Sequence, residues 1–294
     1  MRREATQTIL FVGSGDLASR TTSALAQPAR CIGLCRHPDR LPAGFEGVAG
    51  DYTRGEAFAT LARLAPDIVV LTLKPDGRDA GAYRRGFLAP VQQLLAALGD
   101  HRPRRLLFVS STRVYSESGG DWVDESAPVA SDDSPAGMIA AAEHALLDSG
   151  HPTTLLRSAG LYGGAGGMLL ERIARGELSP AHPIHSANRI HRDDAAGFIA
   201  WLIDREHSGH APLACYNLVD DHPAPQHEVD RWLATAMRVA IPESAAKAGS
   251  GASRGHKRVR NERLRASGYA LRYPDYRSGY AAALGLRGDP VASG

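Results

Sequence analysis

Two glycines and an alanine follow the first apolar run of the sequence at a spacing that suits phosphate binding. Residues 9–12 are Ile, Leu, Phe and Val, and a central parallel strand would bury such a run on both faces. Gly13, Gly15 and Ala18 then form the pattern G-x-G-x-x-A. Because glycine has no Cβ, the backbone can approach a pyrophosphate, whose charge the N–H groups of the next helix would bind. The predicted phosphate contacts are Gly13, Ser14, Gly15, Asp16 and Leu17.

A second strand is predicted at residues 29–35. The residues that follow it indicate which nucleotide the glycine turn would bind. In dinucleotide-binding folds an acidic residue near this strand end binds the ribose 2′-hydroxyl of NAD, whereas an arginine accommodates the 2′-phosphate of NADP. Arg36 follows the strand directly, and Asp39 comes later, beyond a proline. The sequence therefore predicts NADP, with NAD as the alternative and Arg36 as the main contact. The competing interpretation is that Arg36 and Arg40 lie in a solvated loop.

Apolar segments alternate with helical segments through the first part of the chain. Further strands are predicted at residues 45–51, 67–73 and 105–109, and helices at 17–25, 55–64 and 83–98. This alternation predicts an α/β fold of the Rossmann type, a doubly wound parallel sheet whose ligand lies at the carboxyl ends of the strands. Asp51, Lys74 and Ser110 follow three of these strands and are expected to contact the cofactor. A solvated loop lysine is the other interpretation of Lys74.

Several ordered motifs carry a family resemblance. Ser110-Ser111-Thr112-Arg113-Val114-Tyr115 follows the fifth strand, and Asp124 to Pro128, Leu155 to Gly163, Ile190 to Asp194 and Tyr216 to Val219 come after it in order. Together they resemble the extended short-chain dehydrogenase/reductase family, the NAD-dependent epimerase/dehydratase group, over residues 8 to 220. The resemblance implies that Ser111 binds the substrate oxygen and that Ser158 contacts the cofactor. It also makes a homodimer plausible.

The family's proton-transfer pair has no counterpart here. Family members use a tyrosine with a lysine four residues later, since a phenol with a pKa near 10 needs an adjacent cation to exchange protons at neutral pH. Counting back from Glu143 places Pro135 where the tyrosine belongs and Ile139 where the lysine belongs. The chain therefore resembles the atypical branch of the family. Candidate replacement proton donors are Tyr115, Tyr162 and His191. Tyr115 is assigned to catalysis, whereas Tyr162 and His191 are assigned to substrate binding or to packing, which is the usual role of a single tyrosine or histidine.

The expected organisation is one nucleotide-binding domain with a small, discontinuous C-terminal substrate lobe. Residues 5–163 and 190–220 are assigned to the domain, and residues 164–189 and 221–294 to the lobe. A helix is predicted at residues 193–202, with its N-terminus capped by Asp193 or Asp194.

Composition excludes several classes of protein. The net charge is +2, which is too small to favour nucleic acid binding, although residues 256–265 hold a basic cluster. No apolar run is long enough to cross a bilayer, so a cytoplasmic protein without a membrane partner is expected. The cysteines Cys31, Cys35 and Cys215 are interpreted as buried thiols, and no metal site is predicted.

Two functions agree with these observations. The first is an NADP-dependent oxidoreductase or epimerase that acts on a small carbonyl or sugar-like substrate through Ser111 and an unusual proton donor. The second is a protein that binds NADP(H) as a sensor or scaffold without catalysis. The missing tyrosine and lysine favour the second function, whereas the retained serine favours the first.

Overall fold

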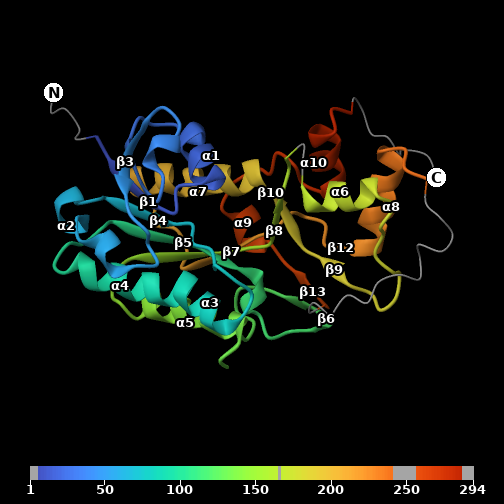
Figure 1. Ribbon diagram of the computed structural model, residues 1–294, viewed down its shortest axis with the longest axis horizontal. Coiled ribbons are helices and arrows are strands. Elements are labelled where there is room, and N and C mark those ends of the chain that lie inside the picture. Colours follow the sequence, from blue (N-terminus) through green and yellow to red (C-terminus); the bar gives the residue numbers. More distant parts are fainter. Residues whose placement is uncertain (1–5, 165–166, 241–255, 287–294) are drawn as a thin grey trace. The chain divides into compact units, whose positions relative to one another are not determined.

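The chain forms two compact units, which Figure 1 shows in a computed structural model that describes residues 6–164, 167–240 and 256–286. The first unit comprises residues 1–115, 129–157 and 196–216, and the second comprises residues 116–128, 158–195 and 217–294. Parts of the predicted substrate lobe, at 165–166, 241–255 and 287–294, lie outside the described residues.

A seven-stranded sheet in the order β11-β7-β5-β4-β1-β2-β3 forms the centre of the fold. Its strands are β1 (Thr8–Val12), β2 (Arg30–Cys35), β3 (Phe45–Ala49), β4 (Ile68–Leu71), β5 (Arg105–Ser111), β7 (Thr153–Ser158) and β11 (Cys215–Leu218). The neighbours from β3 to β5 pair in parallel. This is the strand order of a doubly wound nucleotide-binding sheet, so the predicted α/β Rossmann fold is confirmed.

Helices cover both faces of this sheet, with α1 and α7 on one face and α4 and α5 on the other (Figure 1). Their bounds are α1 (Asp16–Ala24), α2 (Leu61–Leu64), α3 (Ala80–Tyr83), α4 (Ala89–Leu98), α5 (Pro135–Leu147) and α7 (Arg192–His207). Short 3₁₀ helices are η1 (Pro38–Arg40), η2 (Gly55–Phe58) and η4 (Thr112–Val114). The helix α7 begins one residue earlier and ends five residues later than the predicted range 193–202.

The helix predicted at residues 83–98 is interrupted by a π-helical turn. It begins at Ala80, and the π turn η3 (Arg84–Leu88) separates α3 from α4. Pro90 explains the interruption, because it has no N–H to donate to the carbonyl of Gly86 and its ring would clash with that carbonyl in a regular helix. Gly86 itself lies so close to the loop after β4 that a Cβ there would be 2.6 Å from the Cα of Pro75.

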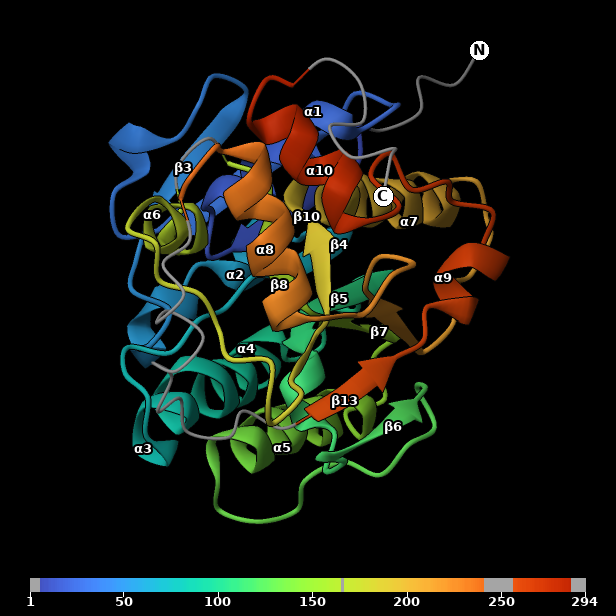
Figure 2. The same ribbon diagram turned by 90° about the vertical axis from the view of Figure 1, so that its right-hand side faces the viewer.

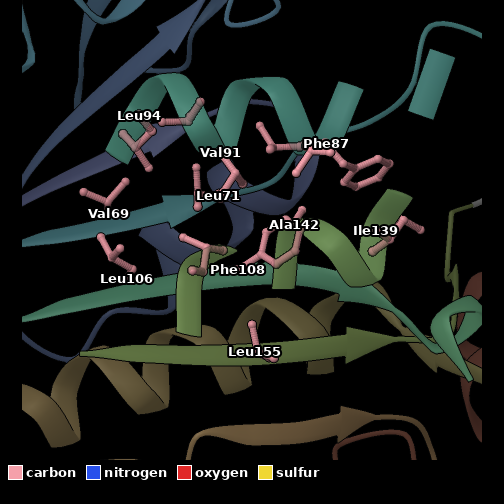
Figure 3. Close-up of a cluster of buried hydrophobic side chains, with 14 of the residues drawn as sticks. Val69, Leu71, Phe87, Val91, Leu94, Leu106, Phe108, Ile139, Ala142 and Leu155 are labelled. Carbon is pink, nitrogen blue, oxygen red and sulfur yellow. The ribbon is translucent and has the colours of Figure 1, made fainter. Parts of the chain in front are cut away.

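The hydrophobic core of the first unit lies between the sheet and the helices α4 and α5. Val69, Leu106 and Phe108 point from the sheet toward Leu94 of α4 and Ile139 of α5 (Figure 3). These side chains are buried, which confirms that the near-continuous apolar runs are central strands. Cys31 and Cys215 are buried free thiols as predicted, whereas Cys35 is only half-buried.

The second unit is built from short strands and helices. They are β6 (Gly119–Val123), β8 (Gly160–Tyr162), β9 (Ser186–Ala187), β10 (Arg189–His191), β12 (Ala224–Pro225), β13 (His256–Val259), α6 (Met168–Ala174), α8 (Gln226–Ala236), α9 (Glu262–Ala266) and α10 (Tyr276–Ala283). The strand β13 lies beside β6 (Figure 2), and β10 pairs with β8. These pairings explain why residues 116–128, 158–163, 190–195 and 217–220 belong to this unit, a division that differs from the predicted boundaries.

Candidate functional site

The turn after β1 requires glycine at its first position. Gly13 has a φ of +87°, and its N–H donates to the carbonyl of Leu34 at 3.1 Å. A Cβ at Gly13 would lie 2.5 Å from the carbonyl oxygen of Thr72, whose hydroxyl also donates to the carbonyl of Gly13. The turn is therefore held between β2 and β4, which explains why its first position is a glycine, while its contact with a phosphate remains a prediction.

The next part of the turn leaves room for a diphosphate. Gly15 is the N-cap of α1 without a capping side chain, and a Cβ built on it would meet no atom within 4 Å. The hydroxyl of Ser14 donates to the carbonyl of Phe11 at 2.9 Å, and Ala18 is fully buried against the sheet. The uncapped N–H groups at the start of α1 and the open space at Gly15 fit the pyrophosphate of a dinucleotide.

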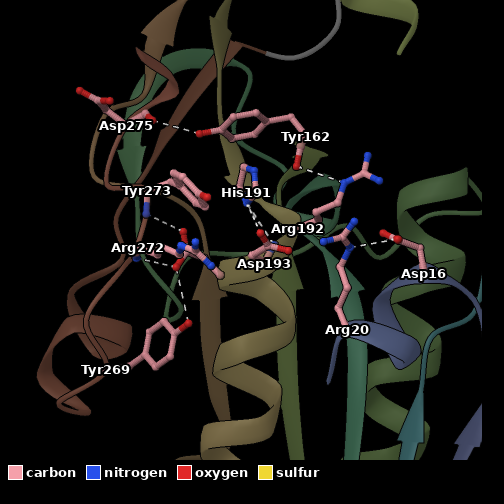
Figure 4. A network of polar contacts seen from close by, with 11 residues as sticks. Asp16, Arg20, Tyr162, His191, Arg192, Asp193, Tyr269, Arg272, Tyr273 and Asp275 are labelled. Carbon is pink, nitrogen blue, oxygen red and sulfur yellow. Dashed lines mark hydrogen bonds and ion pairs between the residues drawn. The ribbon is translucent and has the colours of Figure 1, made fainter. Parts of the chain in front are cut away.

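Asp16 puts a carboxylate into the first turn of α1, close to where an anion would bind. Its Oδ1 lies 2.9 Å from Nε of Arg20, as Figure 4 shows. This ion pair offsets the negative charge, and the contacts of Asp16 and Leu17 with a phosphate remain predictions.

Arg36, Asp51 and Lys74 come after β2, β3 and β4, at the carboxyl edge of the sheet. The hydroxyl of Thr53 donates to Asp51 at 2.7 Å and lowers the pKa of that carboxyl, and the charge of Arg36 acts in the same direction. Burial raises the pKa of Tyr52, and the charge of Arg36 opposes this shift. The Tyr52 hydroxyl lies 3.4 Å from the backbone nitrogen of Lys74. The charge of Arg36 thus acts on Asp51, and the backbone of Lys74 lies near Tyr52, while the contacts of all three residues with a cofactor remain predictions.

The two serines at the end of β5 lie in different surroundings. Ser111 is half-buried, and its Oγ accepts a hydrogen bond from the N–H of Arg113 at 3.2 Å. Ser110 is buried, and its hydroxyl donates to Glu143 at 2.5 Å. The hydroxyl of Ser110 is therefore used inside the unit, so its predicted contact with a cofactor has no support beyond its place at the strand end.

A buried ion pair connects Ser110 to Tyr115. Arg157 donates to both carboxylate oxygens of Glu143, at 2.8 and 3.2 Å, and Glu143 is 1% exposed. The guanidinium of Arg157 lies 4.8 Å from the ring centroid of Tyr115, which is 2% exposed. Tyr115, the first candidate proton donor, is thus packed on a cation in the interior rather than at an open surface.

The helix α5 contains the two positions at which the sequence places the family's missing proton-transfer pair. Pro135 is its first residue, after the N-cap Ser134, whose Oγ accepts from the N–H of Gly137 at 3.1 Å. Ile139 is 1% exposed and belongs to the hydrophobic core. Neither the proline nor the isoleucine side chain can donate or accept a proton.

Tyr162 and Ser158, both in the second unit, are used in packing. The Tyr162 hydroxyl donates to the carbonyl of Asp275 at 3.0 Å (Figure 4), and its ring lies 4.6 Å from that of Tyr280. Burial raises the pKa of Tyr162, which disfavours its ionised form. The Ser158 hydroxyl donates to the carbonyl of Ala159 at 3.0 Å.

His191 is buried at the junction of β10 and α7. It is 3% exposed, its ring centroid lies 3.9 Å from that of Tyr273, and its Nδ1 accepts from the N–H of Asp193 at 3.1 Å. His191 therefore caps the start of α7, and a Cβ at Gly163, where φ is +111°, would overlap its ring. The substrate-binding roles predicted for Tyr162 and His191 remain predictions.

The prediction that Asp193 or Asp194 caps α7 is wrong for Asp194. Its carboxylate accepts from the N–H groups of Arg272 and Tyr273 at 2.7 and 2.9 Å, and from the hydroxyl of Tyr269 (Figure 4). Burial raises the pKa of Asp194. Sequence analysis could not find this role, because the partners lie more than seventy residues further along the chain.

Asp220 is a second buried carboxyl that sequence analysis missed. It is 2% exposed, and its N–H donates to the carbonyl of Arg189 at 2.8 Å. Burial raises the pKa of Asp220 to about 8, although the charge of Arg189 opposes the shift. The only sequence signal is an aspartate directly after an apolar strand.

We expect this carboxyl to make stability depend on pH. The unfolded chain ionises it near pH 4, whereas the folded protein keeps it protonated to about pH 8, so the folded state binds more protons between these values. The free energy of unfolding should therefore fall as the pH rises from about 4 to about 8. Asp220→Asn should be more stable than the wild type at pH 8 by on the order of 3 kcal/mol in urea unfolding, with the exposed Asp121→Asn as control. Equal pH dependence in Asp220→Asn and the wild type would contradict this expectation.

The basic cluster at residues 256–265 has partners within the second unit. Arg258 donates to the carbonyl of Gly120 at 2.9 Å, Arg260 pairs with Glu262, and Arg263 pairs with Glu125. This use of the charges agrees with the interpretation as a solvated face, and the absence of a nucleic acid partner remains a prediction.

These features define the class of the protein. The chain belongs to the NAD(P)H-binding family, whose sequence model matches residues 13–206, and it shares the fold of the epimerase/dehydratase-like short-chain dehydrogenases/reductases. The match begins at the glycine turn and ends in α7.

Particular relatives agree with this classification. A solved structure from Methylobacillus flagellatus, provisionally named an NAD-dependent epimerase/dehydratase, is 34% identical, has a TM-score of 0.79 and matches 96% of this chain and 98% of that chain. Protein YeeZ of Escherichia coli (strain K12) is 31% identical over 159 residues, which are 54% of this chain and 55% of that protein. The chain thus spans about half the length of this curated relative. The Bordetella bronchiseptica enzyme WbmG, solved with NAD and UDP, is 17% identical over 97% of this chain and 95% of that chain with a TM-score of 0.76, which shows the fold alone.

Metal sites and membrane spans can be assessed for residues 6–164, 167–240 and 256–286, which the structure describes. In these ranges no group of three or more His, Cys, Asp or Glu side chains is arranged to hold a metal ion. No helix there combines the length and the apolar character that a bilayer span requires.

Proposed function

We propose that this chain is an NADP(H)-dependent oxidoreductase or epimerase that acts on a small carbonyl or sugar-like substrate. The observation that carries the proposal is the half-buried Ser111 at the carboxyl end of β5. Parallel strands have their carboxyl ends at one edge of a sheet, so Ser111 and the phosphate turn after β1 share that edge.

In the proposed reaction the cofactor would transfer the hydride, and the protein would bind the substrate and the cofactor. A bound nicotinamide supplies or accepts a hydride at its C4. Ser111 would then bind the substrate oxygen, the glycine turn would bind the diphosphate, and Arg36 would bind the 2′-phosphate. Asp51 lies beside Arg36, and its pKa is lowered mainly by the Thr53 hydroxyl, so it stays ionised and would orient the guanidinium.

The cofactor preference gives a direct prediction. Arg36→Ala should weaken NADPH binding by about 30-fold, since a charge-assisted contact to the 2′-phosphate is lost, and should leave NADH binding almost unchanged. Dissociation constants from nucleotide fluorescence measure both effects. Arg40→Ala, an exposed arginine of the same loop, is the matched control. If Arg36→Ala leaves the NADPH to NADH ratio at its wild-type value, the assignment of Arg36 is wrong.

A second function is favoured by one specific observation. Pro135 and the buried Ile139 remove the usual acid and base, which fits a protein that binds NADP(H) as a sensor or scaffold. The two functions differ in turnover. An enzyme should consume NADPH with some member of a panel of aldehydes, ketones and nucleotide sugars, whereas a sensor should bind NADPH and consume none.

A further inference from the structure

Tyr83 lies where a displaced proton donor could act. It is the last residue of α3, directly before the π turn η3, and its side chain is half-buried. The helix α3 packs against α5, on which Pro135 and Ile139 occupy the positions of the missing pair. π-helical turns are frequent at functional sites, which makes Tyr83 a candidate functional residue.

Aromatic packing holds one side of the ring of Tyr83. It stacks on Phe87 with ring centroids 5.6 Å apart, and Phe87 contacts Phe108 of β5 at 6.3 Å. Phe87 itself lies in the buried cluster between the sheet and α4 (Figure 3). Packing therefore fixes one side of the phenol to the rigid core.

Arg113 connects this ring to the candidate substrate-binding serine. Its guanidinium carbon lies 5.5 Å from the ring centroid of Tyr83, and its backbone N–H donates to Oγ of Ser111 at 3.2 Å. Arg113 is exposed, and it has no ion-pair partner among the residues that the structure describes. A hydroxyl, a phenol and a cation are the three groups that the family's chemistry uses, and Arg113 connects all three in the first unit through its backbone and its side chain.

Tyr83 is better exposed than the other proton donors considered. Tyr115, Tyr162 and His191 are all less than 9% exposed, and Tyr162 and His191 use their polar atoms in hydrogen bonds to the backbone. The hydroxyl of Tyr83 accepts or donates no hydrogen bond within the described part of the chain. The Tyr83 hydroxyl can therefore still form a hydrogen bond with a substrate oxygen.

We propose that Tyr83 is the proton donor and acceptor of the reaction, with Arg113 as its cation. The inference rests on the proposed function. In a reduction, a hydride passes from the C4 of the reduced nicotinamide to the substrate carbonyl carbon, and the π electron pair of the C=O bond moves to the oxygen. The proton of the Tyr83 hydroxyl bonds to this oxygen, which leaves an alcohol, an oxidised nicotinamide and a phenolate that takes a proton from water. A nearby cation favours such a phenolate.

Turnover separates this role from a structural one. For any carbonyl that the wild type reduces, Tyr83→Phe should lower kcat by about 100-fold while KM and NADPH affinity stay within about twofold. Tyr216→Phe, which removes the hydroxyl of a buried tyrosine in the same unit, is the matched control. Arg113→Gln should lower kcat by about tenfold, and Arg113→Lys should restore most of it because the positive charge returns.

A second measurement needs no substrate. Tyr83 should be nitrated by tetranitromethane in the free protein and protected by saturating NADPH, as mapped by mass spectrometry. Equal nitration with and without NADPH, or equal kcat for Tyr83→Phe and Tyr216→Phe, overturns the inference and leaves the proposed function intact. If the wild type binds no NADPH, the proposed function and this inference fail together.

Discussion

Gly15→Val is expected to weaken NADPH binding by on the order of 1,000-fold while the melting temperature stays close to that of the wild type. A Cβ built at Gly15 meets no atom within 4 Å, so we expect the fold to accept a small side chain there. The same side chain would fill the space at the start of α1 that a diphosphate needs, and the backbone amides there would lose their ligand. Calorimetric titration with NADPH and a thermal melt measure the two effects on one sample.

Two other glycines make this prediction specific. Gly55→Val places a side chain in ordinary contact with Gln93, away from the turn, and should change neither NADPH affinity nor melting temperature. Gly13→Ala should lower the melting temperature, because its φ is +87° and a Cβ would lie 2.5 Å from the carbonyl oxygen of Thr72. If Gly15→Val binds NADPH as tightly as the wild type, the diphosphate does not lie at this turn.

Ser111→Ala should lower kcat by about 100-fold to 1,000-fold for any carbonyl that the wild type reduces, the range for one hydrogen-bond donor to a developing oxyanion. Ser111 is half-buried, and its Oγ accepts only from the N–H of Arg113 within the described residues, so its hydroxyl proton can be donated to a substrate. NADPH affinity should change by less than about twofold, because the serine binds the substrate rather than the nucleotide. Stopped-flow measurement of NADPH oxidation gives the rate directly.

Ser23→Ala is a suitable control for this variant, since Ser23 is exposed on α1 and donates only to the carbonyl of Ser19. If Ser111→Ala keeps the wild-type rate, Ser111 does not bind the reacting oxygen. A wild type that oxidises NADPH with no carbonyl of the panel would instead favour the sensor or scaffold.

The parts of the fold that the sequence predicts are those encoded by local patterns. The apolar runs of β1 and β4 are fully buried, and the glycine turn lies directly after β1, because strand burial and turn geometry depend on residues close in sequence. The nucleotide-binding class follows from this turn and from the strand order. The interruption of the third helix was also within reach of sequence analysis, since Pro90 marks it.

The remaining parts depend on contacts between distant segments. Asp194 binds backbone amides more than seventy residues away, and Ser110 of β5 is hydrogen-bonded to Glu143 of α5, so neither role can be deduced from spacing. Tyr83 was missed for the same reason, because its neighbour Arg113 comes from the end of β5. Long-range packing decides which of several similar side chains stays accessible.

The central claim is that the turn after β1 binds a nicotinamide dinucleotide and that Arg36 binds its 2′-phosphate. Calorimetric titration of the wild type with 2′,5′-ADP and with 5′-AMP tests it most directly, because the two ligands differ in that phosphate. We expect 2′,5′-ADP to bind at least about 30-fold more tightly, and NADPH to compete with it for one site. Tighter binding of 5′-AMP, or no heat with either ligand and none with NADPH or NADH, would contradict the claim.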